Sequence, residues 1–190
     1  MSFPILFLDI DGVLCCHNDG VIDRSPLEEL QRVCLATGAR VVLSSDWRRH
    51  AFLTEKVRAS LEEIGVPMLG VTPCGPHGDP VRPLEIRAWI EKHGWRGRFA
   101  VVDDRMLLRE KGGHFLRGHF VRCDPKLGLD RRSADRLLDV LKGGWSRSAD
   151  ARVENLGHIS HAICSCTREC AWRWARYQAC KPFVPLVHDS

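Results

Sequence analysis

Short apolar runs that end in polar residues recur along the chain and predict the strands of a sheet. The clearest runs cover residues 5–8, 40–44 and 98–102. Continuous apolar runs bounded by turn signals are typical of strands that are buried on both faces of a parallel sheet. Two weaker candidates cover residues 66–71 and 119–122.

Helical periodicity occupies the intervals between these runs. Apolar residues recur at spacings of three and four over residues 25–37, 53–64, 84–93 and 133–142. At the start of the first helix, Ser25, Pro26 and Glu28 form the pattern of a capping box with Ser25 as the N-cap. Strands that alternate with helices predict an α/β fold, a three-layer α/β/α sandwich around a parallel Rossmann-like sheet.

Two aspartates follow the first run directly. Asp9 and Asp11 are separated by one residue, so they point to the same side of an extended chain, and Gly12 then breaks the run. Sheets of this kind bind ligands at the carboxyl ends of their strands. Close carboxylates repel one another unless a cation lies between them, and Mg²⁺ is the cation expected here. The alternative is a strand-end turn with solvated aspartates.

Composition restricts the class of protein. The chain of 190 residues has 44% hydrophobic and 27% charged residues and a formal charge of +4, as expected of one globular domain with an appendage. It has no apolar run long enough to span a membrane, and the N-terminus lacks the basic region of a signal peptide. Nine cysteines, an odd number, favour a reducing compartment, so we expect a cytoplasmic protein.

The polar residues that follow the three runs resemble the motifs of the haloacid dehalogenase (HAD) superfamily. Residues 9–14 look like the first motif, and Ser44 is similar to the second. Arg82 stands where the third motif usually has lysine, with Arg87 as an alternative. Asp103 and Asp104 resemble the fourth motif. The order and spacing match over residues 3–142, so residues 1–143 are expected to form a HAD-like catalytic domain without a full cap domain.

The resemblance implies a phosphatase that works through an aspartyl-phosphate. Asp9 would attack phosphorus, and Asp11 would act as the general acid and base. Family members that act as dehalogenases generally lack a carboxylate at the position of Asp11, so its presence points to a phosphorylated substrate. Magnesium would be held by Asp9, by the backbone carbonyl of Asp11, and by Asp103 or Asp104.

Further residues have both a functional and a structural interpretation. Ser44 would bind a phosphoryl oxygen, and the structural alternative is a strand-end turn. Arg82 would supply a positive charge beside the aspartyl-phosphate, and the alternative is a solvated loop residue. The residues expected to contact substrate are Gly12, Ser45, Trp47 and Arg48. Trp47 would stack on a base, whereas core packing is the alternative for its ring.

The intervals 14–40 and 46–82 are too short to hold a full cap domain, which favours large substrates such as nucleic acid ends. The segment that begins at Ser44 and Ser45 looks like the small HAD domains of RNA-repair proteins, and Asp103 and Asp104 look like the corresponding stretch of polynucleotide phosphatases. Two rival interpretations are a small-metabolite phosphatase and an inactive HAD fold that serves as a binding module.

Residues 144–190 form a Cys- and Trp-rich extension to which the resemblance does not reach. Its cysteines match no common zinc module, although a zinc site remains an alternative. Its aromatic residues alternate with arginines, which suits either single-strand binding or a short helix packed on the core.

Overall fold

The computed structural model describes residues 3–17, 20–74 and 81–143. The expected extension at 144–190, with its zinc and single-strand alternatives, lies outside the described residues. Among the described residues, no helix has the length and apolar character needed to cross a membrane.

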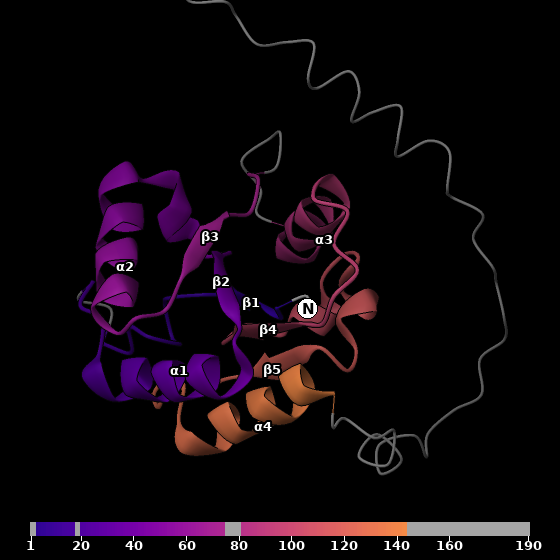
Figure 1. Cartoon of the computed structure of the whole chain (residues 1–190). Coiled ribbons are helices and arrows are strands. Elements are labelled where there is room, and N and C mark those ends of the chain that lie inside the picture. The colour runs from indigo at the N-terminus through magenta and orange to yellow at the C-terminus, as the bar shows by residue number, and fades with distance from the viewer. Residues whose placement is uncertain (1–2, 18–19, 75–80, 144–190) are drawn as a thin grey trace, which may run out of the picture. The chain divides into compact units, whose positions relative to one another are not determined.

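Five parallel strands form the central sheet (Figure 1). The strands are β1 (Ile5–Leu8), β2 (Arg40–Leu43), β3 (Met68–Val71), β4 (Phe99–Asp103) and β5 (Phe120–Arg122). Their order in the sheet is β3-β2-β1-β4-β5, and every neighbouring pair is parallel. The predicted α/β fold with a parallel sheet is therefore confirmed.

Helices cover both faces of the sheet because its central strands present apolar side chains to both sides. The helices are α1 (Arg24–Thr37), α2 (Ala51–Glu63), α3 (Arg82–Lys92) and α4 (Arg131–Lys142). Leu6 and Leu8 of β1 join the core under α1, α2 and α4, while Ile5 and Phe7 join the core under α3. Figure 1 shows α1 beside α4, with α3 on the opposite face of the sheet.

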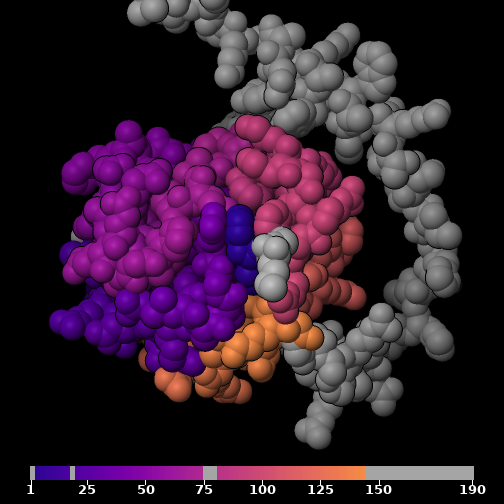
Figure 2. Space-filling model, viewed as in Figure 1, coloured from indigo at the N-terminus to yellow at the C-terminus, as the bar shows by residue number. Residues whose placement is uncertain are grey.

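Burial of β1 is complete, as its uninterrupted apolar run predicts. Residues Ile5–Leu8 are 0% exposed. In the space-filling view, only a narrow strip of the indigo N-terminal segment is visible between the side chains of the flanking elements (Figure 2). Asp9 therefore directly follows a strand that is buried on both faces.

The first helix starts differently from the prediction. It begins at Arg24 with Asp23 as its N-cap residue, and no side chain makes a capping hydrogen bond. The predicted capping box at Ser25 is therefore wrong. The carboxylate of Asp23 instead accepts a hydrogen bond of 2.8 Å from the backbone N–H of Cys16, so it ties the loop after β1 to the helix.

The order of the strands reverses between β1 and β4. From β1 the chain builds outward through β2 and β3, then crosses to the other side of β1 to form β4. Ligands of open α/β sheets bind at the carboxyl ends of the strands at such a switch point. Leu8 of β1 pairs with Val102 of β4, so Asp9 and Asp103 leave the sheet side by side.

Candidate active site

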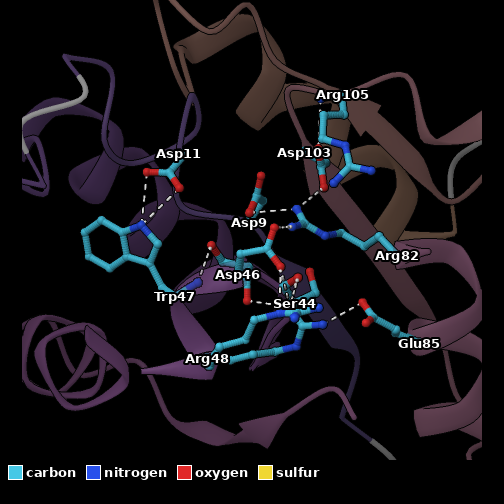
Figure 3. A network of polar contacts seen from close by, with 12 residues as sticks. Asp9, Asp11, Ser44, Asp46, Trp47, Arg48, Arg82, Glu85, Asp103 and Arg105 are labelled. Atoms are coloured by element: carbon cyan, nitrogen blue, oxygen red, sulfur yellow. Dashed lines mark hydrogen bonds and ion pairs between the residues drawn. The ribbon is translucent and has the colours of Figure 1, made fainter. Parts of the chain in front are cut away.

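Asp9 and Asp103 lie at the switch point and share one arginine. Nη1 of Arg82 lies 2.7 Å from Oδ1 of Asp9 and 2.6 Å from Oδ2 of Asp103 (Figure 3). The exposed fractions of these three side chains are 2% for Arg82, 5% for Asp9 and 0% for Asp103. In a region with so little water, the arginine is the counter-charge that allows two neighbouring carboxylates to be buried.

Arg82 reaches the site because it is the first residue of α3. The sequence placed it ahead of that helix, in a loop, but α3 begins two residues earlier than expected and Pro83 stands in its first turn. Proline is favoured there because the first backbone N–H groups of a helix have no intrahelical partner. The alternative candidate, Arg87, instead places its guanidinium 4.6 Å from the ring centre of Phe115. Arg82 is therefore the arginine that the structure brings to Asp9.

The pKa values of both Asp9 and Asp103 are raised in the folded protein. Burial, and then the charge of Asp9, raise the pKa of Asp103 to about 7, although Arg82 acts in the opposite direction. Burial also raises the pKa of Asp9, against the opposing charge of Arg82. Burial lowers the pKa of Arg82, but the charges of Asp9 and Asp103 raise it above its ordinary value, so the arginine stays charged.

A third carboxylate completes a cluster of oxygen atoms. Asp9, Asp103 and Asp104 each offer an oxygen, and these atoms lie within 4.8 Å of one another. Carboxylate oxygens are the protein ligands that Mg²⁺ prefers. The donor set therefore fits the expected metal. Asp11, whose predicted contribution is a backbone carbonyl, lies outside this cluster of side-chain oxygens.

Gly12 lies against the cluster and leaves no room for a side chain. A Cβ atom at this position would lie 2.7 Å from Oδ2 of Asp104, and the backbone angle φ is +69°. Gly38 has a closely similar φ of +68°, and a Cβ atom there would meet nothing within 4 Å. The structure places Gly12 where it admits the carboxylate of Asp104, and its expected contact with substrate stays a prediction.

We expect Gly12→Ala to weaken metal binding, because the new methyl group must displace the carboxylate of Asp104. Gly38→Ala is the matched control: each variant should lose about 1 kcal/mol of folding stability from its left-handed backbone. Titration with Mg²⁺ by calorimetry checks the difference. Equal metal affinity in both variants would show that Asp104 does not bind the metal.

Ser45, rather than Ser44, lies against the carboxylate of Asp9. Burial raises the pKa of Asp9, and hydrogen bonding from the Ser45 side chain acts in the opposite direction. The hydroxyl of Ser44 is fully buried and has no hydrogen-bond partner among the described residues. The sequence favoured Ser44 for the second motif because it directly follows the apolar run. The next residue along is the one in contact with Asp9.

Arg48 was expected to contact substrate, but its side chain is 0% exposed. Its guanidinium donates to the backbone carbonyls of Ser44, at 3.2 Å, Ser45, at 2.6 Å, and Thr72, at 3.2 Å. It also lies 2.6 Å from Oε2 of Glu85, a buried residue of α3. These contacts leave Arg48 as a structural residue that holds the end of β2 against α3, close to Arg82.

Glu85 and Asp46 are site residues that sequence reasoning did not assign. Glu85 follows Arg82 by three residues, so both lie on one face of α3. Asp46 Oδ2 lies 3.5 Å from Nη2 of Arg82 and supplies a third, more exposed carboxylate to that arginine. Helical spacing from Arg82 is the signal that could have identified Glu85.

Trp47 is buried and binds Asp11. The residue is 6% exposed, and its indole N–H lies 3.0 Å from both carboxylate oxygens of Asp11. A ring that is packed into the core has no open face for a base, so the expectation of stacking is replaced by core packing with a polar contact. Asp11 itself is exposed. In the view of Figure 3, Asp11 and Trp47 lie on one side of Asp9, and Arg82 and Asp103 lie on the other.

A family model described as "HAD domain in Swiss Army Knife RNA repair proteins" matches residues 5–134 of the chain. The matched segment begins at β1 and ends within α4, so it includes every residue of the site described above. Comparisons with curated proteins and with solved structures give no match.

Proposed function

Because the chain belongs to the family of HAD domains in Swiss Army Knife RNA repair proteins, we propose that it is a magnesium-dependent phosphatase that forms an aspartyl-phosphate on Asp9. One observation carries the proposal: three carboxylates at the switch point lie within reach of one cation, beside a buried arginine. A protein that only binds a partner has no need to bury like charges together, because burial of unpaired charge is costly.

In the first step a carboxylate oxygen of Asp9 attacks phosphorus, and the bond between phosphorus and the leaving oxygen breaks. The leaving oxygen takes the bonding electron pair and a proton from Asp11. In the second step Asp11 takes a proton from water as the water oxygen attacks phosphorus, which releases Asp9 and phosphate. Arg82, 2.7 Å from Asp9, favours the ionised form of the nucleophile.

Asp9, Asp103 and Asp104 would hold Mg²⁺, which supplies positive charge to the phosphoryl oxygens when bound. The hydroxyl of Ser45 is the group placed to contact the phosphoryl group, because it already contacts Asp9. We also retain Ser44 as a candidate, because its buried hydroxyl has no partner among the described residues.

We favour a phosphate on a nucleic acid or nucleotide as substrate. The family description, with its reference to RNA repair, supports this class. Within the described residues, the connections from β1 to β2 and from β2 to β3 each hold a single α-helix, with one short 3-10 turn, and no inserted cap domain. We also propose a cytoplasmic location, because an odd total of nine cysteines favours a reducing compartment.

Phosphate release from a substrate panel tests this function. The panel contains a generic aryl phosphate, nucleotides, sugar phosphates, and oligonucleotides phosphorylated at either end, each with Mg²⁺ and with chelator. We expect turnover only with Mg²⁺ and the highest kcat/KM for an oligonucleotide end. A preference for sugar phosphates would overturn the substrate class and leave the chemistry intact. If no substrate turns over while calorimetry shows Mg²⁺ binding, the chain is a binding module.

A further inference from the structure

Asp11 is exposed, yet its carboxylate makes two contacts with a buried ring. Both carboxylate oxygens lie 3.0 Å from the indole nitrogen of Trp47, 36 residues further along the chain. An exposed aspartate samples several side-chain rotamers unless a partner fixes one of them. A single N–H shared between both oxygens restrains the direction of the carboxyl group as well as its position.

The partner is itself firmly held. Trp47 belongs to the apolar core under α1, α2 and α4, and its residue is 6% exposed. Its backbone N–H donates to the side chain of Ser45, which caps the short helical turn Asp46–Arg49. Ser45 also contacts Asp9. The short turn that contains Ser45 and Trp47 therefore contacts both Asp9, the proposed nucleophile, and Asp11, the proposed general acid.

We propose that Trp47 is a positioning residue, which holds Asp11 in the orientation needed to give a proton to the leaving oxygen. The proposal rests on the proposed function, because it assigns Asp11 the role of general acid. When Asp11 carries its proton on one oxygen, the indole N–H donates to the other. The protonated oxygen is then free to face the oxygen that departs with the bonding electron pair.

The way in which the loss of kcat/KM depends on the leaving group distinguishes a positioning role from a purely structural one. An alkyl leaving oxygen needs a proton as its bond to phosphorus breaks, whereas a dinitrophenolate leaves without one. We expect Trp47→Phe, which keeps an aromatic ring but lacks the N–H, to lower kcat/KM for a nucleoside monophosphate by about 10-fold. The value for dinitrophenyl phosphate should stay within about twofold of the wild type, because that reaction needs little general acid catalysis.

Two variants complete the comparison. Asp11→Asn should show the same selectivity with a larger loss, about 10²-fold for the nucleoside monophosphate. Trp89→Phe is the matched control, because Trp89 is also 6% exposed but packs against Phe7 on the other face of the sheet. Trp89→Phe should lose a similar amount of folding stability, and any change in its kcat/KM should be the same for both leaving groups. The quantity kcat/KM is used because it reports only the steps up to formation of the aspartyl-phosphate.

A spectroscopic readout tests the contact without turnover. The indole N–H resonance of Trp47, assigned by its loss in Trp47→Phe, should move in Asp11→Asn because a charged acceptor is replaced by a neutral one. An unmoved resonance would show that the contact is absent. Equal losses of kcat/KM on all phosphates in Trp47→Phe would also overturn the proposal. If the wild type turns over nothing, the proposed function fails and the positioning role with it, while the resonance still decides the contact.

Discussion

Asp9→Asn is expected to lower turnover of every phosphorylated substrate by about 10³-fold or more, because the amide cannot attack phosphorus. The protein should remain folded. Asparagine keeps a carbonyl oxygen that can accept from Arg82, which in the wild type lies 2.7 Å from Asp9. The change also removes one of two buried negative charges, so repulsion with Asp103 disappears.

Steady-state phosphate release with Mg²⁺, together with thermal unfolding, measures the two effects. A trapping experiment tests the intermediate: wild-type protein quenched with acid during turnover should retain phosphate that hydroxylamine releases, and Asp9→Asn should retain none. Turnover above about a tenth of the wild-type value in a folded Asp9→Asn variant would rule out Asp9 as the nucleophile.

Arg82→Met is expected to destabilise the metal-free protein by about 3–5 kcal/mol at pH 8, the largest effect on stability among these predictions. Methionine fills similar space but leaves Asp9 and Asp103 buried without their shared counter-charge. Urea unfolding in the presence of a chelator measures the loss. Arg82→Lys is the control, since it keeps a positive charge at the same position and should recover most of the stability.

The loss of folding stability in Arg82→Met should become smaller as the pH falls. In the wild type the pKa of Asp103 is raised to about 7, whereas an aspartate in the unfolded chain has its ordinary pKa of 3.8. Between these two pH values the folded state binds more protons, so stability falls as the pH rises and levels off above about 7. Without Arg82 the folded pKa rises further, which extends this window to higher pH. At pH 5 the variant should therefore lie closer to the wild type.

Metal provides a second test of the same electrostatic argument. Mg²⁺ bound by the carboxylates would replace the missing positive charge, and at about 100 times its Kd it should stabilise the folded variant by about 2.7 kcal/mol. An Arg82→Met protein whose stability depended on neither pH nor Mg²⁺ would contradict the view that buried carboxylates cause the loss.

Local sequence was enough to predict the sheet and the acidic end of β1. Strands buried on both faces need uninterrupted apolar runs, so the pattern identifies them without tertiary information. The carboxyl ends of neighbouring parallel strands meet at one edge, which is why Asp9 and Asp103 could be expected to lie together. The helix boundaries were less certain: the N-cap residue of α1 is Asp23 rather than Ser25, and the Asp23 side chain bonds to the distant backbone N–H of Cys16.

The second polar segment was ambiguous in the sequence, since Ser44 and Ser45 are adjacent hydroxyl residues. Only the direction in which the chain leaves β2 decides which hydroxyl faces Asp9, and it is Ser45. Charge patterning was a poor guide for Arg48, because a guanidinium next to a candidate site suggests phosphate binding. Its actual partners include three backbone carbonyls and Glu85, which come together only through the packing of β2, β3 and α3.

The sequence by itself determined a parallel α/β fold, the family, and the identity of the acidic residues at the switch point, because these depend on local periodicity and on residue type. Tertiary structure decided which neighbours bind those residues. Arg82 reaches Asp9 and Asp103, and Trp47 reaches Asp11, across many residues of intervening chain. Such contacts depend on how helices dock on the sheet, and no short window of sequence contains that information.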